Sequence, residues 1–100
     1  MTSQDKLFRI DENGYLPQVT QIESPNYDLR SSKQTISLIV IHSISLPPNK
    51  FGNSHIEDFF KNDLDVSQHT YFKKIKDLKV SSHFLIKRKG ELIQFVSCLK

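Results

Sequence analysis

Residues 81–96, which read SSHFLIKRKGELIQFV, predict a β-hairpin. Phe84 and Ile86 alternate with their neighbours along the first strand, Gly90 supplies the turn, and the segment ELIQFV returns. A hairpin is stable only within a larger sheet or against a helix. The rest of the chain must therefore add strands and helices to this unit.

Residues 36–42, ISLIVIH, predict the central strand of that sheet. Ile, Leu and Val occupy positions of both parities, which is typical of a strand that is covered on both faces. The run ends on His42 and passes into a Ser-rich loop closed by Pro47 and Pro48. A histidine there is either a packed residue at the end of a strand or a side chain held at the edge of the sheet for chemistry.

Two segments between these strands predict short helices. In the first, at about residues 55–62, Ser54 and Glu57 have the spacing of a capping box and the apolar side chains share one face. In the second, over residues 66–78, Tyr71, Phe72 and Ile75 face inward and the lysines outward. The predicted fold is α/β, a mixed central sheet with flanking helices.

The sequence also bounds the domain organisation. One hundred residues with 37% hydrophobic side chains suit a single domain with a thin core. Residues 1–13 are polar and predict a flexible tail before a domain over residues 14–100. The sheet stops directly after the second hairpin strand, so we expect the fold to be incomplete at its C-terminal end.

Composition and targeting signals point to the cytoplasm. No basic region followed by an apolar stretch marks a secretory signal, and the longest apolar run is too short to cross a membrane. Cys98 is the only cysteine, which excludes an internal disulfide and suits a reducing compartment. We expect Cys98 to be a small buried apolar residue rather than a reactive thiol.

Half of the fourteen basic residues lie between positions 73 and 89, and they could attract an anion. They are Lys73, Lys74, Lys76, Lys79, Lys87, Arg88 and Lys89. They do not form a stripe with interleaved aromatic residues, so a solvated face is favoured over a nucleic-acid site. We expect no nucleic-acid partner.

The four histidines differ in their expected roles. His55 and His69 lie at the starts of the predicted helices and favour surface polar roles. His42 and His83 adjoin strands, where open α/β sites are built. The chain has no H-E-x-x-H, C-x-x-C or G-x-S-x-G motif, so spacing alone completes neither a zinc site nor a hydrolase triad.

Four segments together resemble the zinc-dependent N-acetylmuramoyl-L-alanine amidases, most closely the cytosolic AmpD branch that recycles anhydromuropeptides. They are NGYLPQVTQIESPNYDLR, LIVIHSISLPPNKFG, IEDFF and LKVSSHFLIKRKGELIQFV, and they cover residues 13–100 in the family's order. The resemblance therefore covers only the N-terminal part of an amidase domain.

The resemblance implies roles for three residues. His42 corresponds to the first zinc ligand, Ser43 stands where close relatives carry a substrate-binding Asn, and Lys79 stands where they carry an Arg that can meet a peptide carboxylate. Lys79 would offer a point charge instead of a two-pronged contact. Ser82 replaces a tyrosine of more distant relatives, so His83 is expected to be structural or to line the site.

The family's reaction implies a function. A zinc-activated water hydrolyses the amide between the 1,6-anhydro-N-acetylmuramyl group and L-alanine in cell-wall muropeptides. The family supplies its second histidine, its aspartate ligand, its general base and its oxyanion-stabilising cation from a later segment, so no catalytic residue is expected within this chain. The alternative is a truncated remnant that binds muropeptides without the metal.

Overall fold

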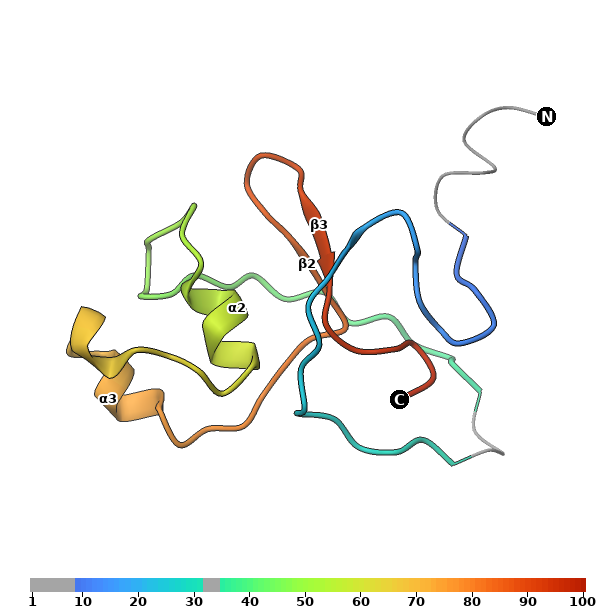
Figure 1. Ribbon diagram of the computed structural model, residues 1–100, viewed down its shortest axis with the longest axis horizontal. Coiled ribbons are helices and arrows are strands. Elements are labelled where there is room, and N and C mark those ends of the chain that lie inside the picture. Colours follow the sequence, from blue (N-terminus) through green and yellow to red (C-terminus); the bar gives the residue numbers. More distant parts are fainter. Residues whose placement is uncertain (1–8, 32–34) are drawn as a thin grey trace.

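The computed structural model describes residues 9–31 and 35–100 (Figure 1). Its elements follow the order β1 (Thr20–Gln21), α2 (His55–Phe60), the 3-10 helix η1 (Val66–Gln68), α3 (Phe72–Ile75), β2 (Phe84–Ile86) and β3 (Leu92–Gln94). Residues 1–8 of the predicted tail lie outside the described part. None of the helices in the described ranges has the length and apolar character needed to span a membrane.

β3 is the middle strand of a three-stranded sheet with the order β1-β3-β2. It pairs in parallel with β1 and antiparallel with β2, so the predicted mixed sheet with helices is confirmed. Backbone bonds extend both ladders past the strand ends: Ser24 N–H donates to Phe95 O at 3.0 Å, and Phe95 N–H donates to His83 O at 2.8 Å.

The hairpin of β2 and β3 is confirmed. Lys87 N–H donates to Glu91 O at 2.8 Å across the turn, and Gly90 adopts a φ of +91°, which favours glycine. β1 was not predicted, because its two residues are exposed and carry no apolar alternation. This strand forms through its pairing with β3 rather than through a pattern of its own.

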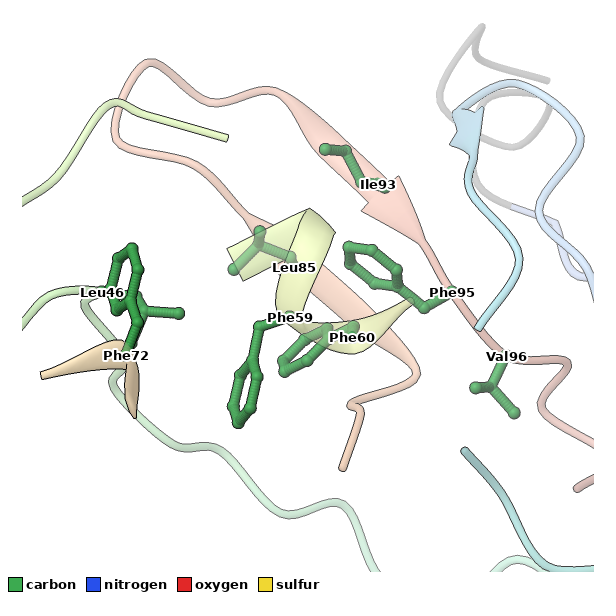
Figure 2. Close-up of a cluster of buried hydrophobic side chains, with 8 residues drawn as sticks. All are labelled: Leu46, Phe59, Phe60, Phe72, Leu85, Ile93, Phe95 and Val96. Carbon is green, nitrogen blue, oxygen red and sulfur yellow. The ribbon is translucent and has the colours of Figure 1, made fainter. Parts of the chain in front are cut away.

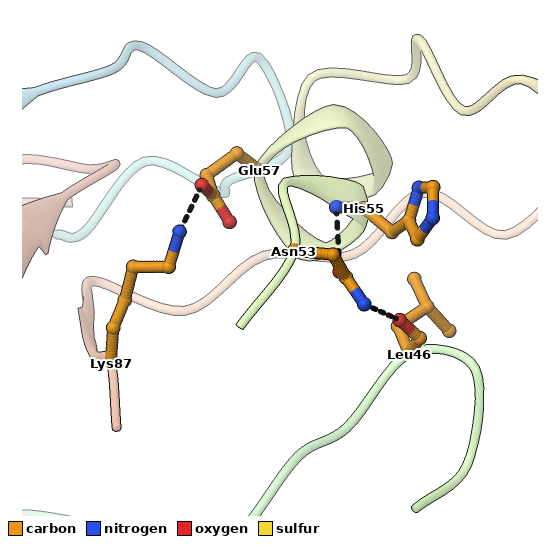
Figure 3. Close-up of polar contacts among 5 residues, drawn as sticks. All are labelled: Leu46, Asn53, His55, Glu57 and Lys87. Atoms are coloured by element: carbon orange, nitrogen blue, oxygen red, sulfur yellow. Dashed lines mark hydrogen bonds and ion pairs between the residues drawn. The ribbon is translucent and has the colours of Figure 1, made fainter. Parts of the chain in front are cut away.

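The first predicted helix is confirmed as α2, but its predicted cap is wrong. Ser54 makes no side-chain capping bond. Asn53 takes that role, because its Oδ1 accepts from His55 N–H at 3.0 Å and its amide donates to Leu46 O at 3.0 Å (Figure 3). The carboxylate of Glu57 reaches Lys87 instead of the helix N-terminus.

The second predicted helix is divided into η1 and α3. The Asp65 carboxylate accepts from Ser67 N–H and caps η1, while His69 is extended at φ −163° and ψ 140°. The ring Nδ1 of His69 then accepts from Tyr71 N–H at 3.0 Å, which begins a new turn. The inward face is confirmed, since Phe72 is fully buried.

The central strand predicted at residues 36–42 is wrong for this structure. The segment pairs with no other described strand, and no residue between 35 and 44 makes a hydrogen bond within the described part of the chain. A strand needs neighbours to take up its backbone groups. No other described segment lies in register beside this one, so it crosses the molecule as an irregular trace (Figure 1).

The core lies between the sheet and the helices. It contains Leu46, Phe59, Phe60, Phe72, Leu85, Ile93, Phe95 and Val96 (Figure 2). The rings of Phe60 and Phe95 meet edge to face with centroids 5.0 Å apart, which joins α2 to the strand that continues β3. This aromatic contact fixes the helix against the sheet.

Gln94 joins the N-terminal segment to the middle of the sheet. Its side chain is buried, its Oε1 accepts from Leu16 N–H at 2.7 Å, and its amide donates to Gly14 O at 2.9 Å and Val96 O at 3.0 Å. The three shorter hydrogen bonds of the amide go to backbone groups, and Oε1 also accepts from Gln21 Nε2 at 3.5 Å. One side chain therefore holds the turn before β1.

Gly14 lies against the C-terminal segment. Its carbonyl accepts from Cys98 N–H at 2.8 Å, and its φ is +84°. A Cβ at this position would collide with Ser97 Oγ and lie 2.9 Å from the Leu99 nitrogen. Only glycine permits this close approach of two backbones.

We expect Gln94→Met to lower the free energy of unfolding by about 3 kcal/mol, because Leu16 N–H and Gly14 C=O lose their buried partner. Urea denaturation monitored by circular dichroism measures the change. The control Gln68→Met removes one exposed contact to Asp65 and should change stability by less than about 0.5 kcal/mol. Equal losses in the two variants would contradict the role assigned to Gln94.

A second prediction separates close approach from backbone strain. Gly90→Ala should cost about 1 kcal/mol, because φ is positive and the surroundings are open. Gly14→Ala should cost about 2 kcal/mol more, since the added methyl group also displaces packed atoms. The same urea titration tests this order, and a smaller loss for Gly14→Ala than for Gly90→Ala would refute it.

Candidate functional site

His42 lies on the exposed, unpaired segment. Its side chain is exposed, as is that of Ser43 beside it. Neither residue makes a hydrogen bond within the described part of the chain. The imidazole is therefore open to a ligand, and no described hydrogen bond fixes its orientation.

Lys79 lies on the wall of a hollow of about 420 Å³. Pro25, Asn26, Tyr27 and Asp28 form one side of the hollow, and residues 79–81 form the other. His42 and Ser43 are not among the lining residues. The structure thus separates Lys79 from the other two predicted site residues, which share no cavity with it.

Asn26 holds the two sides of this hollow together. Its amide nitrogen lies 3.0 Å from Val80 O, 3.1 Å from Phe60 O and 2.7 Å from Asn62 Oδ1. Ser24, two residues earlier, is buried and donates to the same Phe60 carbonyl at 2.6 Å. The hollow is therefore built by side chains anchored to the C-terminal end of α2, which the sequence reasoning missed.

The hollow carries opposite charges on facing segments. Lys79 provides an ammonium group, Asp28 a carboxylate and Tyr27 a half-exposed phenol. The Lys100 ammonium lies 5.6 Å from the centroid of the Tyr27 ring. Such a polar, open site can hold a ligand with a carboxylate at the lysine and a donor at the aspartate.

Two members of the basic cluster have structural partners. Lys87 Nζ lies 2.8 Å from Glu57 Oε2 and joins the hairpin to α2 (Figure 3). The Arg88 guanidinium lies 3.7 Å from the centroid of the Phe51 ring. Lys87 and Arg88 therefore have partners within the chain, and the ion pair of Lys87 leaves fewer side chains of the basic cluster available to bind an anion.

The other histidines support the fold. The His55 ring meets Phe72 edge to face at 4.9 Å, and the His69 ring lies 5.7 Å from the same phenyl group. His83 is exposed, and its Nε2 lies 3.1 Å from Lys100 O. Each of the three has a structural contact.

The donor set of the described residues does not by itself fit a zinc ion. A catalytic zinc takes three protein ligands, and no three His, Cys, Asp or Glu side chains come together in residues 9–31 and 35–100. His42 can contribute one nitrogen. A complete centre would need donors besides those described.

A family model for N-acetylmuramoyl-L-alanine amidases matches residues 32–100, a region that contains His42, Ser43, Lys79 and the whole hairpin. The chain belongs to this amidase family. The match begins close to the exposed segment and continues through both helices, so it covers most of the described fold.

Individual members of the amidase family agree with this assignment. The 1,6-anhydro-N-acetylmuramyl-L-alanine amidase AmpD of Haemophilus influenzae is 48% identical over 86 residues, covering 86% of this chain and 47% of the relative. The enzyme of the same name from Escherichia coli is 42% identical over 85 residues, covering 85% and 46%. The chain spans about half the length of the curated relatives it matches.

Solved structures of AmpD match the fold. The crystal structure of a selenomethionine AmpD derivative gives a TM-score of 0.80 at 42% identity, over 86% of this chain and 48% of that one. The solution structure of Citrobacter freundii AmpD gives 0.50 at 43% identity. The observed arrangement is therefore that of one part of an amidase.

Cys98 is half-buried in the structure, and its environment opposes ionisation. Burial raises the pKa of its thiol above the ordinary value, and the Arg30 guanidinium partly offsets this effect. A thiol kept protonated is a poor nucleophile. The expectation of an unreactive cysteine agrees with this direction.

We expect alkylation of Cys98 by iodoacetamide to reach its half-maximal rate at a higher pH in the folded protein than in urea. The reason is that only the thiolate reacts and the folded state disfavours it. Arg30→Gln should move the half-maximal rate of the folded protein to a still higher pH, because a nearby cation is lost. A half-maximal rate at the same pH in the folded protein as in urea, or at a lower pH, would disprove this account.

Proposed function

We propose that these residues form the N-terminal half of a cytoplasmic amidase domain that hydrolyses the bond between the 1,6-anhydro-N-acetylmuramyl group and L-alanine. The substrate is a muropeptide, and the reaction belongs to peptidoglycan recycling. The observation that carries the proposal is the 48% identity to an enzyme of that name over 86% of this chain. The family match over residues 32–100 supports it.

In this proposal His42 is one of three zinc ligands. Its exposed ring, free of other partners in the described chain, is consistent with that role. The bound metal would supply an activated water for attack on the amide carbonyl. The remaining ligands and the general base would come from the half of the domain that the match leaves uncovered.

Lys79 and Ser43 are the proposed substrate contacts. The hollow beside Lys79 offers its ammonium to a carboxylate of the peptide stem, with the Asp28 carboxylate on the opposing segment. Ser43, next to the proposed ligand, would donate or accept a single hydrogen bond near the scissile group. The two contacts would hold different parts of one extended substrate.

A chimera tests the proposal directly. Residues 13–100 replace the matching part of the Haemophilus influenzae AmpD, and peptide release from a 1,6-anhydromuramyl peptide is followed by liquid chromatography. We expect hydrolysis with about one zinc per chain. His42→Ala should lose the zinc and more than about 100-fold in activity, because mutation of the residues that merely orient a metal ligand already costs roughly 10–100-fold in metal affinity or activity. The control is His69→Asn, which keeps a side-chain acceptor for Tyr71 N–H at an exposed histidine distant in sequence.

The same chimera tests the lysine. Lys79→Arg should lower KM roughly fivefold with kcat unchanged, since a planar guanidinium adds one charged hydrogen bond to a carboxylate. Lys76→Arg, an exposed lysine on no wall of the hollow, should have no effect. An unchanged KM in Lys79→Arg would remove Lys79 from the substrate site.

A second candidate is a muropeptide-binding chain that does not hydrolyse its ligand. It is favoured by one observation, namely that the hollow beside Lys79 is built without any metal ligand. Calorimetry of the 100-residue chain with the same muropeptide separates the two functions. Binding by the chain, together with a zinc-free and inactive chimera, would favour this candidate.

A further inference from the structure

We propose that a small recess between the hairpin turn and the loop before α2 binds the phosphate group of a ligand. The recess encloses about 50 Å³. Its lining consists of residues 50–53 of the loop, residues 85–88 of the hairpin, Ile44 and Ile56. Figure 1 shows the hairpin turn at the far end of β2 from residues 79–81, which line the hollow beside Lys79. The inference therefore stands apart from the proposed hydrolysis.

The charge of the recess is positive. Its lining includes the cations Lys50, Lys87 and Arg88, and none of the described residues that line it is Asp or Glu. The Lys87 ammonium is already balanced, because it lies 2.8 Å from the Glu57 carboxylate (Figure 3). Lys50 and Arg88 are exposed, and neither has an ion-pair partner within residues 9–31 and 35–100. Two positive charges thus remain unbalanced at one place.

Phe51 positions one of these two charges. The guanidinium carbon of Arg88 lies 3.7 Å from the centroid of the Phe51 ring. Such a stacked contact uses one face of the planar guanidinium and leaves the N–H groups in its plane free to donate. The Arg88 side chain makes no hydrogen bond to any other described residue. The aromatic partner therefore holds Arg88 in place without using its hydrogen-bonding capacity.

The size of the recess limits what it can enclose. A buried water needs roughly 10–15 Å³ and a drug-sized ligand fills roughly 300–1,000 Å³, so a recess of about 50 Å³ holds a group of a few heavy atoms. The lining is open beside Gly52, because nothing lies within 4 Å of the position that a Cβ would take there. The remainder of a larger ligand would stay outside at this opening.

Charge and geometry favour phosphate over carboxylate. A phosphate monoester carries about −1.5 to −2 charges at pH 7 and three strong acceptor oxygens, which matches the two unbalanced cations. A carboxylate carries a single charge, so it would leave one of the two cations uncompensated. Arginine binds phosphate through parallel N–H bonds and lysine binds it as a point charge, which are the roles inferred for Arg88 and Lys50.

Inorganic phosphate is the first probe of the full 100-residue chain. Its binding is followed through the backbone amide resonances in about 0.15 M sodium chloride, where exposed charges more than about 8 Å apart are largely screened. We expect half-saturation on the order of 1 mM, with the largest shifts at Gly52, Asn53 and Arg88. Val80, on the wall of the hollow beside Lys79, should not shift.

Matched variants locate the contact. Arg88→Gln should weaken phosphate binding at least about tenfold, because it removes the stacked cation and its charged hydrogen bonds. Lys89→Gln removes the same charge from the next position, which is exposed and does not line the recess, and should change the affinity less than about twofold. Phe51→Leu keeps every cation but loses the stack, so it should weaken binding about threefold. Circular dichroism of these surface variants should match that of the parent.

A second probe separates a soluble phosphate from a lipid head group. The chain is sedimented with vesicles made of equal parts phosphatidylglycerol and phosphatidylcholine. Vesicle binding that Arg88→Gln loses and Lys89→Gln keeps would support the site with a lipid phosphate as its ligand. Binding of inorganic phosphate without vesicle binding would support it with a soluble phosphate ester or phosphate itself.

Three results would overturn the inference. The first is that neither probe binds the chain. The second is equal weakening by Arg88→Gln and Lys89→Gln, which would indicate a diffuse attraction between charges rather than a site. The third is a shift of Val80 in place of the amides of the recess, which would assign the anion to the hollow beside Lys79. None of these results bears on amide hydrolysis, so failure of the phosphate site and failure of the proposed function are distinguishable.

Discussion

The buried amide of Gln94 is the interaction on which the rest of this structure depends. Its backbone lies on the middle strand, paired with β1 on one side and β2 on the other. Its side chain at the same time holds Gly14 and Leu16. A two-residue strand has little stability of its own, so β1 exists because this amide positions the turn that leads into it.

The sheet that contains Gln94 packs against the helices and makes the organised side of the molecule, whereas the segment that carries His42 has no backbone partner among the described residues. The aromatic core joins α2, α3 and the hairpin on the organised side (Figure 2). The hollow beside Lys79 lies on that side, anchored through Asn26. His42, by contrast, lies on a segment with no described backbone partner. The proposed substrate contact at Lys79 is therefore preformed, while the proposed metal ligand acquires its geometry only when the segment is paired.

Local patterns predicted more of the fold than of the site. The hairpin turn at Gly90, the extent of α2 and the burial of Phe72 follow from alternation and helical periodicity. The caps did not follow, because Asn53 and His69 compete for the same orphan backbone groups as the residues with the expected spacing. His42 stood out only through its place after an apolar run, and its assigned role came from resemblance to the family rather than from spacing.

The sequence alone determined the β-hairpin and the inward faces of the helices, and its resemblance to known segments determined the family. The hairpin and the helix faces depend on neighbouring positions along one segment, where side-chain order and backbone bonds are local. Only the tertiary structure decided that residues 36–42 pair with no other described segment and that Asn26 builds a hollow with Lys79. A strand's hydrogen bonds belong to two segments at once, so an apolar run becomes a strand only where another backbone lies beside it.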